Sequence, residues 1–248
     1  PSPTMTMRIC ILETDILRPQ LIGQYQGYGR MFKQLFEKQS IPAQFDVYNV
    51  VEGSYPDEDQ LYDAYLITGS KADSFGTDPW ILTLREYLLA RYENGDRLIG
   101  ICFGHQLLAL LLGGKTERAA QGWGLGVNRY QLIEQPQWMS PDLQNLDLLV
   151  FHQDQVTVLP ENATLLATSE FCPNAAYSIG DQVLCFQAHP EFVDDYEMAL
   201  LNLRREFLGE ALYAQALDSM QLPHHGVVVA EWMLHFVAQE RAQNRLAA

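Results

Sequence analysis

The sequence predicts an α/β fold in which a doubly wound, mostly parallel sheet is flanked by helices. Short apolar runs, typical of buried strands, alternate with helical segments through the first half of the chain. The connections between them are short, as in successive strand–helix–strand units. Candidate functional segments at Gly69, Cys102 and His189 each follow a predicted strand, and parallel sheets carry their sites at the carboxyl ends of strands.

The composition fits a globular protein of one domain. The 248 residues suffice for a sizeable core, and we interpret 1–248 as one domain with a core of about 7–192 and a helical C-terminal extension of about 193–248. A net charge of −15 argues against nucleic-acid and anionic-membrane partners. We expect a cytoplasmic protein, because residues 1–6 lack a signal-peptide core, no apolar span reaches membrane length, and the four cysteines are widely spaced.

The first half of the chain contains four predicted strands with helices between them. The strands are Arg8–Leu12, Phe45–Val50, Asp63–Ile67 and Leu98–Ile101, and the helices are Arg30–Lys38, Pro79–Tyr92 and Gln106–Leu112. Phe45–Val50 alternates apolar and polar residues, which places it nearer an edge of the sheet. Asp78 and Pro79 suit the first turn of the second helix, and Asn94-Gly95 ends it.

Beyond Gly114 the pattern changes to short β segments separated by glycine, proline and asparagine. These segments are Val127–Ile133, Leu146–Phe151, Val156–Leu159, Thr164–Ala167 and Ala175–Ile179. Such a pattern predicts antiparallel additions at the edge of the sheet. Another apolar strand follows at Val183–Ala188, and three helices complete the chain: Tyr196–Leu208, Ala211–Met220 and Gly226–Gln239.

A strand-to-helix turn at Cys102 is the strongest catalytic signal. Glycines at 100 and 104 flank Ile101-Cys102-Phe103, and a nucleophile on such a strained turn needs small neighbours. The helix that begins just after Cys102 directs its positive dipole end at the sulfur, which favours a thiolate. From this turn alone, a small buried residue in a tight packing site is an equally good interpretation.

A candidate base for Cys102 follows the last predicted strand. A cysteine nucleophile needs a base within hydrogen-bond reach, and the base needs a carboxylate to orient it. His189 and Glu191 are two residues apart around Pro190, so the end of the strand can place both side chains on one face. Together with the turn at Cys102, this pair favours a Cys-His-Glu triad over a solvated loop.

These segments resemble the motifs of class I, triad-type glutamine amidotransferases. The nucleophile motif corresponds to Gly100–Gln106 and the second motif to His189–Glu191; Tyr65–Ser70 resembles the oxyanion strand and loop, and Phe151–Val156 the segment beside the bound glutamine. The four motifs occur in the family's order over roughly residues 7–192. The chain is also similar to the amidotransferase domain of GMP synthase, which implies a flavodoxin-like sheet.

The resemblance implies acyl transfer from a γ-glutamyl amide, with Cys102 as nucleophile, His189 as proton shuttle and Glu191 as its orienting group. It also implies an oxyanion hole made by the main-chain N–H groups of Ser70 and Phe103. Ser70 stands where the family often has a second glycine. A further set of residues is expected to bind substrate: Gly69, Gln106, Phe151 and His152.

Several functions stay open at the level of sequence. We interpret the chain first as a glutamine amidotransferase or glutaminase that releases glutamate and ammonia and passes the ammonia to a separate synthetase subunit. The alternative is a free-standing γ-glutamyl hydrolase, which would accept bulkier leaving groups. A catalytically silent binding module is a third interpretation. Metal-dependent hydrolysis is a fourth, because acidic and histidine pairs occur, but their spacing matches no metal signature. We therefore expect no metal and no cofactor.

Overall fold

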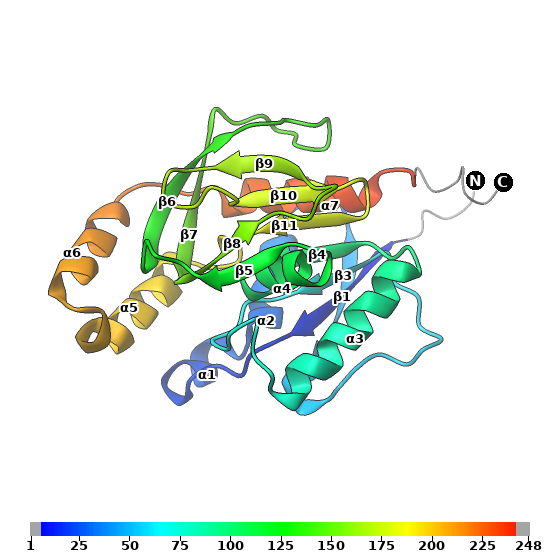
Figure 1. Ribbon diagram of the computed structural model, residues 1–248, viewed down its shortest axis with the longest axis horizontal. Coiled ribbons are helices and arrows are strands. Elements are labelled where there is room, and N and C mark those ends of the chain that lie inside the picture. The colour runs from blue at the N-terminus through cyan, green and yellow to red at the C-terminus, as the bar shows by residue number, and fades with distance from the viewer. Residues whose placement is uncertain (1–5, 242–248) are drawn as a thin grey trace.

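The computed structural model describes residues 6–241. A large twisted sheet runs through the molecule, with helices on both faces (Figure 1). The expectations about a signal peptide and the start of the chain fall largely on residues 1–5, and the C-terminal extension includes 242–248; both segments lie outside the described residues. The division into one domain stays a prediction.

The parallel half of the sheet contains five strands and was predicted strand by strand. The strand order across the whole sheet is β2-β1-β3-β4-β11-β10-β9-β6-β7. The parallel strands are β1 (Met7–Glu13), β2 (Ala43–Asn49), β3 (Ala64–Ile67), β4 (Leu98–Ile101) and β11 (Val183–Phe186). The edge position expected for Phe45–Val50 is confirmed, because β2 is the first strand of the sheet.

The other half of the sheet is antiparallel, as the change of pattern after Gly114 predicted. It contains β6 (Gly124–Leu132), β7 (Asn145–His152), β9 (Thr164–Thr168) and β10 (Ala176–Ile179). One strand is placed differently from the prediction. β8 (Asp154–Val158) leaves the main sheet and pairs with β5 (Lys115–Arg118), a strand that the sequence pattern did not indicate.

Two layers of helices bury the two faces of the parallel strands. On one face lie α2 (Tyr28–Phe36) and α7 (Gly226–Ala238), and on the other lie α3 (Pro79–Glu93) and α4 (Phe103–Leu111). The apolar face predicted for the first helix is buried, including Phe32 and Phe36. The helix α4 begins immediately after Cys102, as the turn predicted, and therefore extends one turn before the apolar run at Gln106.

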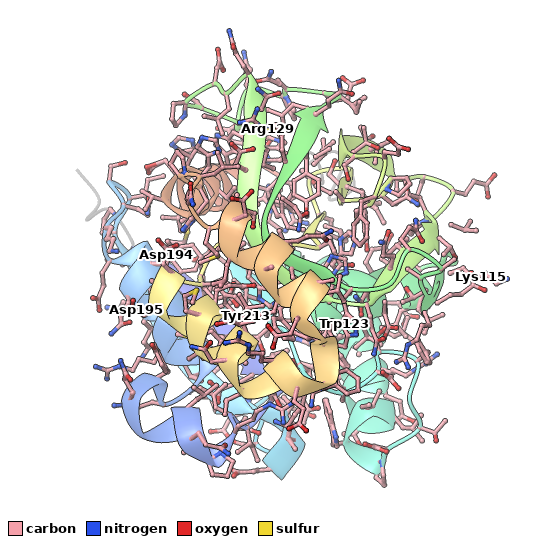
Figure 2. The ribbon with its side chains drawn as sticks, turned by 90° about the vertical axis from the view of Figure 1, so that its left-hand side faces the viewer. Lys115, Trp123, Arg129, Asp194, Asp195 and Tyr213 are labelled. Atoms are coloured by element: carbon pink, nitrogen blue, oxygen red, sulfur yellow. The ribbon has the colours of Figure 1, made fainter. Side chains whose placement is uncertain are left out.

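The remaining helices gather at the end of the sheet where the parallel strands terminate. They are α1 (Pro19–Tyr25), α5 (Asp194–Leu208) and α6 (Glu210–Ser219), with a short 3-10 turn at Val50–Glu52. Figure 2 faces this end and shows α5 and α6 in front of the sheet, with Trp123 beside them. No helix was predicted between residues 12 and 30, yet α1 forms there: Pro19 suits its first turn and Leu21 is buried.

Candidate active site

Cys102 lies on a strained turn between β4 and α4. Its backbone has φ 53° and ψ −102°, a conformation that residues other than glycine rarely adopt. The Cys102 N–H donates a hydrogen bond to the Phe186 carbonyl at 2.9 Å, so the neighbouring strand holds the turn in place. The side chain is 5% exposed and lines a cavity of about 180 Å³. Strain of this kind is a recurring feature of catalytic nucleophiles.

The two glycines that flank Cys102 are required by close backbone packing. A Cβ on Gly104 would lie 2.4 Å from the Ile67 carbonyl oxygen, and one on Gly100 would lie 2.6 Å from the Gly104 carbonyl. No side chain fits at such distances. The first turn of α4 therefore lies directly against the ends of β3 and β4, which brings its N-terminus to the sulfur.

His189 is oriented by Glu191 and by an aromatic neighbour. Its Nδ1 lies 2.9 Å from Glu191 Oε2, and both side chains are buried. The main-chain N–H of His189 donates to the main-chain carbonyl of Leu149 at 2.9 Å. The Phe192 ring stacks on the imidazole, with the ring centroids 3.8 Å apart. The backbone and the ring of His189 are thus both fixed, and its side chain lines the same cavity as Cys102.

Three buried histidines lie near the cavity, and their electrostatic environments differ. Burial lowers the pKa of His105 to about 3 and that of His152 to about 4. Burial opposes a charge on His189 too, but the charges of Glu191 and Cys102 and hydrogen bonds to both outweigh it and raise the pKa of His189. At neutral pH His189 is therefore the one of these three that can hold a proton beside the sulfur.

The loop after β3 lies against the predicted triad. A Cβ on Gly69 would lie 2.6 Å from His189 Cε1 and 3.5 Å from Cys102 Cβ. Thr14 Oγ1 donates to the Gly69 carbonyl at 2.8 Å and holds the loop in position. Ser70, the next residue, lines the cavity. The loop therefore lies beside both Cys102 and His189, and the role of the Ser70 N–H as an oxyanion donor stays a prediction.

The side chain of Phe103 lies in the core, and only its backbone is adjacent to Cys102. Its ring packs against Trp80 with centroids 5.6 Å apart, inside the core that α3 and α4 share. Its N–H belongs to the first turn of α4, where helical N–H groups have no partner within the helix. This group and the Ser70 N–H are the two donors that we predicted for an oxyanion.

The predicted substrate-binding residues lie in two places. Gln106, Phe151 and His152 line the cavity with Cys102. Gly69 does not line it, and instead supports His189 from behind. Its close packing against the imidazole is a feature that was not predicted, and its contact with substrate stays a prediction.

Gln187 was not predicted as a site residue. Its Nε2 donates to Cys102 Sγ at 3.4 Å, and its side chain is completely buried. A polar residue inside the apolar run Val183–Ala188 was the available signal. Two cavity-lining aromatic residues around His189, Tyr28 and Phe192, were not predicted either.

The charges that line the cavity are unevenly paired. Asp15 forms an ion pair with Lys71 at 2.6 Å. Asp73 and Asp154 pair with Arg118 at 2.9 and 3.0 Å. Two further cations also line the cavity, Arg18 and Arg204, and neither forms an ion pair within residues 6–241. The cavity therefore has cationic groups available to an anionic ligand.

The described residues contain neither a metal-binding cluster nor a membrane-spanning helix. Between residues 6 and 241, no group of three or more histidine, cysteine, aspartate or glutamate side chains is arranged to hold a metal ion. Within the same range, no helix has the length and apolar character needed to cross a membrane.

Comparison with known proteins identifies the family. A family model described as "Glutamine amidotransferase class-I" matches residues 46–203, more than half of the chain. Gamma-glutamyl peptidase 3 of Arabidopsis thaliana is 37% identical over 176 residues, which cover 68% of this chain and 70% of the relative. Gamma-glutamyl peptidase 4 of the same plant is 36% identical, with 69% and 70% covered.

Solved structures show the same fold. A glutamine amidotransferase from Thermotoga maritima has a TM-score of 0.75 at 18% identity, covering 95% of this chain and all of that one. A protein described as a GMP synthase subunit from Thermoplasma acidophilum has a TM-score of 0.57 at 15% identity, covering 84% of this chain and all of that one. The match to the family model and the identity with the curated relatives agree with this fold, and the chain belongs to the class-I glutamine amidotransferase family.

Proposed function

We propose that this protein hydrolyses γ-glutamyl amides through a thioester on Cys102. The observation that carries the proposal is the His189 imidazole, held at 2.9 Å by Glu191 and facing the same cavity as a cysteine on a strained strand-to-helix turn. A nucleophile, a base and an orienting carboxylate are the three parts that such catalysis needs. Membership of the amidotransferase family supports the same chemistry.

The reaction divides into two steps. In the first, the Cys102 thiolate attacks the γ-carbonyl carbon, and the His189 imidazolium gives its proton to the leaving nitrogen as the C–N bond breaks. In the second, His189 takes a proton from water, the hydroxide attacks the thioester, and the C–S bond breaks to release glutamate. The N–H groups of Ser70 and Phe103 would stabilise the negative oxygen in both steps.

We propose that Gln106, Phe151 and His152 hold the glutamyl part of the substrate. All three line the cavity, and His152 is buried with its Nε2 unpartnered within the described structure. Burial lowers the pKa of His152 to about 4, so its ring is neutral at pH 7 and provides a hydrogen bond without a charge.

The identity of the leaving group separates the two enzyme hypotheses. We favour a γ-glutamyl peptide over glutamine, because Arg18 and Arg204 offer unpaired positive charges to a carboxylate on the leaving group. The relatives named gamma-glutamyl peptidase support this choice. A glutaminase that supplies ammonia to a separate synthetase subunit is the second candidate, favoured by the likeness to amidotransferase structures.

A covalent probe tests the nucleophile. We expect a diazo-ketone analogue of glutamine to form one adduct, located by peptide mass spectrometry on Cys102. Cys102→Ala should prevent labelling, and His189→Ala should slow it strongly. The other three cysteines provide internal references, because Cys10, Cys172 and Cys185 are buried and, unlike Cys102, do not line the cavity. An adduct on another residue, or none while a general thiol reagent still modifies Cys102, would contradict the proposal.

A substrate series tests the leaving group. Hydrolysis of glutamine, γ-glutamylethylamide and γ-glutamylglycine would be compared by glutamate release. A peptidase should show its highest kcat/KM with γ-glutamylglycine, the one compound of the three whose leaving group carries a carboxylate. If glutamine is the best substrate, the glutaminase hypothesis replaces the peptidase hypothesis.

A further inference from the structure

We propose that Gln187 is a positioning residue that fixes the Cys102 sulfur and stabilises its thiolate through a buried amide relay. The inference rests on the proposed role of Cys102 as the nucleophile. It concerns a residue outside the triad, the predicted oxyanion hole and the predicted glutamyl pocket. The evidence is a chain of three hydrogen bonds that starts at a backbone carbonyl and ends at the sulfur.

Strand pairing places Gln187 beside Cys102. Phe186 of β11 pairs in register with Ile101 of β4, so the next residue of each strand, Gln187 and Cys102, is also adjacent. The Phe186 carbonyl accepts the Cys102 N–H, and the Gln187 N–H donates to the Ala175 carbonyl at 2.9 Å. Both backbones are therefore fixed on either side of the contact between the side chains.

The relay has only one consistent direction. The Asp154 carbonyl can only accept, so the group of Gln106 that faces it at 3.0 Å must be the amide Nε2. The same Nε2 donates its second hydrogen to Gln187 Oε1 at 3.1 Å. With its oxygen facing Gln106, Gln187 must turn its own Nε2 toward Cys102 Sγ, where the distance is 3.4 Å. A backbone carbonyl thus determines which end of the amide meets the sulfur.

A donor in this position favours the charged form of the nucleophile. A hydrogen bond from an amide N–H is stronger to a thiolate than to a neutral thiol, and the effect is larger where water is excluded. Gln187 and Gln106 are 0% and 4% exposed, so water does not compete with the relay. Among the described residues, Gln187 provides the side-chain hydrogen bond to the sulfur, and His189 lines the same cavity as Cys102.

The relay also determines what Gln106 can offer a substrate. Both hydrogens of its Nε2 are committed, to the Asp154 carbonyl and to Gln187. Only Oε1 is left for a ligand in the cavity, and an oxygen accepts from a donor such as an α-ammonium group. One residue therefore serves the substrate pocket and the orientation of Gln187 at the same time.

The test measures the rate at which iodoacetamide alkylates Cys102 as a function of pH, read by peptide mass spectrometry. In Gln187→Met, which keeps the length of the side chain and removes the donor, we expect the rate below neutral pH to fall about tenfold and the pH profile to move to higher pH. Gln187→Leu, which removes both the donor to the sulfur and the acceptor for Gln106, should lower the rate by a similar amount. The assay uses no γ-glutamyl substrate, so failure of the proposed function would not affect its outcome.

Gln182→Met is the matched control. Gln182 is a half-buried glutamine just before β11 whose Nε2 donates to the Tyr92 and Asp96 carbonyls at 2.8 and 3.0 Å, and it does not line the cavity. It should lose similar hydrogen bonds without changing the alkylation profile. An unchanged profile in folded Gln187→Met, or an equal change in Gln182→Met, would overturn the proposal. If Gln187→Met does not fold, Gln187→Leu decides, and a wild-type profile there overturns the proposal equally.

Discussion

The inner and outer parts of the cavity are built in different ways. The inner part, Cys102, His189 and Glu191, is buried and attached to strands β4 and β11 of the parallel sheet. The outer part includes Arg18 and Arg204, which are half-buried and come from the segment before α1 and from α5. The parallel sheet therefore holds the proposed catalytic residues, while the proposed contacts to the leaving group come from segments added around it.

If the inner part acts as one unit, removing the charge of Glu191 should have the largest effect. Glu191→Gln keeps the shape but leaves the His189 imidazole without its anionic partner. We expect kcat to fall by about 10³ to 10⁴ with little change in KM, as for the orienting carboxylate of other triads. Steady-state kinetics would measure it. A fall of less than about tenfold would show that Glu191 does not orient the base.

Gly69→Ala tests the packing behind the imidazole. The new methyl group would lie 2.6 Å from His189 Cε1, so the ring must move. A displacement of this size should lower kcat by about 10². The control is Gly23→Ala in α1, where a Cβ would meet nothing within 4 Å. If Gly69→Ala retains the wild-type rate, the loop after β3 does not constrain the base.

Arg204→Gln tests whether the outer part can be changed alone. We expect KM for γ-glutamylglycine to rise about tenfold, the scale of a hydrogen bond to a charged group, while γ-glutamylethylamide, which has no leaving-group carboxylate, is unaffected. The control is Arg205→Gln, because Arg205 is exposed and pairs with Glu210 at 2.9 Å. An equal loss with both substrates would place the contact on the glutamyl group instead.

The inner part of the cavity was much easier to predict from sequence than the outer part. The glycines around Cys102 and the His-Pro-Glu segment are local sequence patterns. The tight turn and the pairing of histidine with glutamate each depend on residues that lie close together in the sequence. Gln187 matters only through the register between β4 and β11, which no local pattern reveals. Arg18 and Arg204 are far apart in sequence and line one cavity only after folding.

The errors in the predicted fold also arise where contacts distant in sequence, and not the local pattern, determine the structure. The segment of α1 contains Pro19 and Gly23, and its local sequence gives only weak support for a helix. The strand β8 pairs with β5 across a long separation in sequence, and a short β segment does not specify its partner. The central parallel strands β3, β4 and β11 were predicted correctly because complete burial makes them continuously apolar.

Glu197 joins the outer part to the sheet, and replacing it should affect stability much more than catalysis. Its Oε2 accepts the Gly126 N–H at 3.0 Å and ties α5 to β6, while the side chain is completely buried. Burial raises the pKa of Glu197 from 4.5 to about 8. Between these values the folded protein keeps a proton that the unfolded chain has released, so the free energy of unfolding should decrease as pH rises.

The matching variant is Glu197→Gln, which has no proton to lose. Over this pH window the free energy of unfolding of wild type should fall by up to about 1.4 kcal/mol per pH unit relative to that of the variant. The variant should therefore be clearly more stable than wild type at about pH 8, with little difference between the two near pH 5. Urea unfolding of both proteins across this range measures the difference, and kcat should stay within a few-fold because Glu197 does not line the cavity. Parallel pH dependences in the two proteins would show that Glu197 is ionised in the fold. A charged carboxylate would then hold α5 against β6. The stability of the outer part of the cavity would depend less on pH than the burial of Glu197 implies.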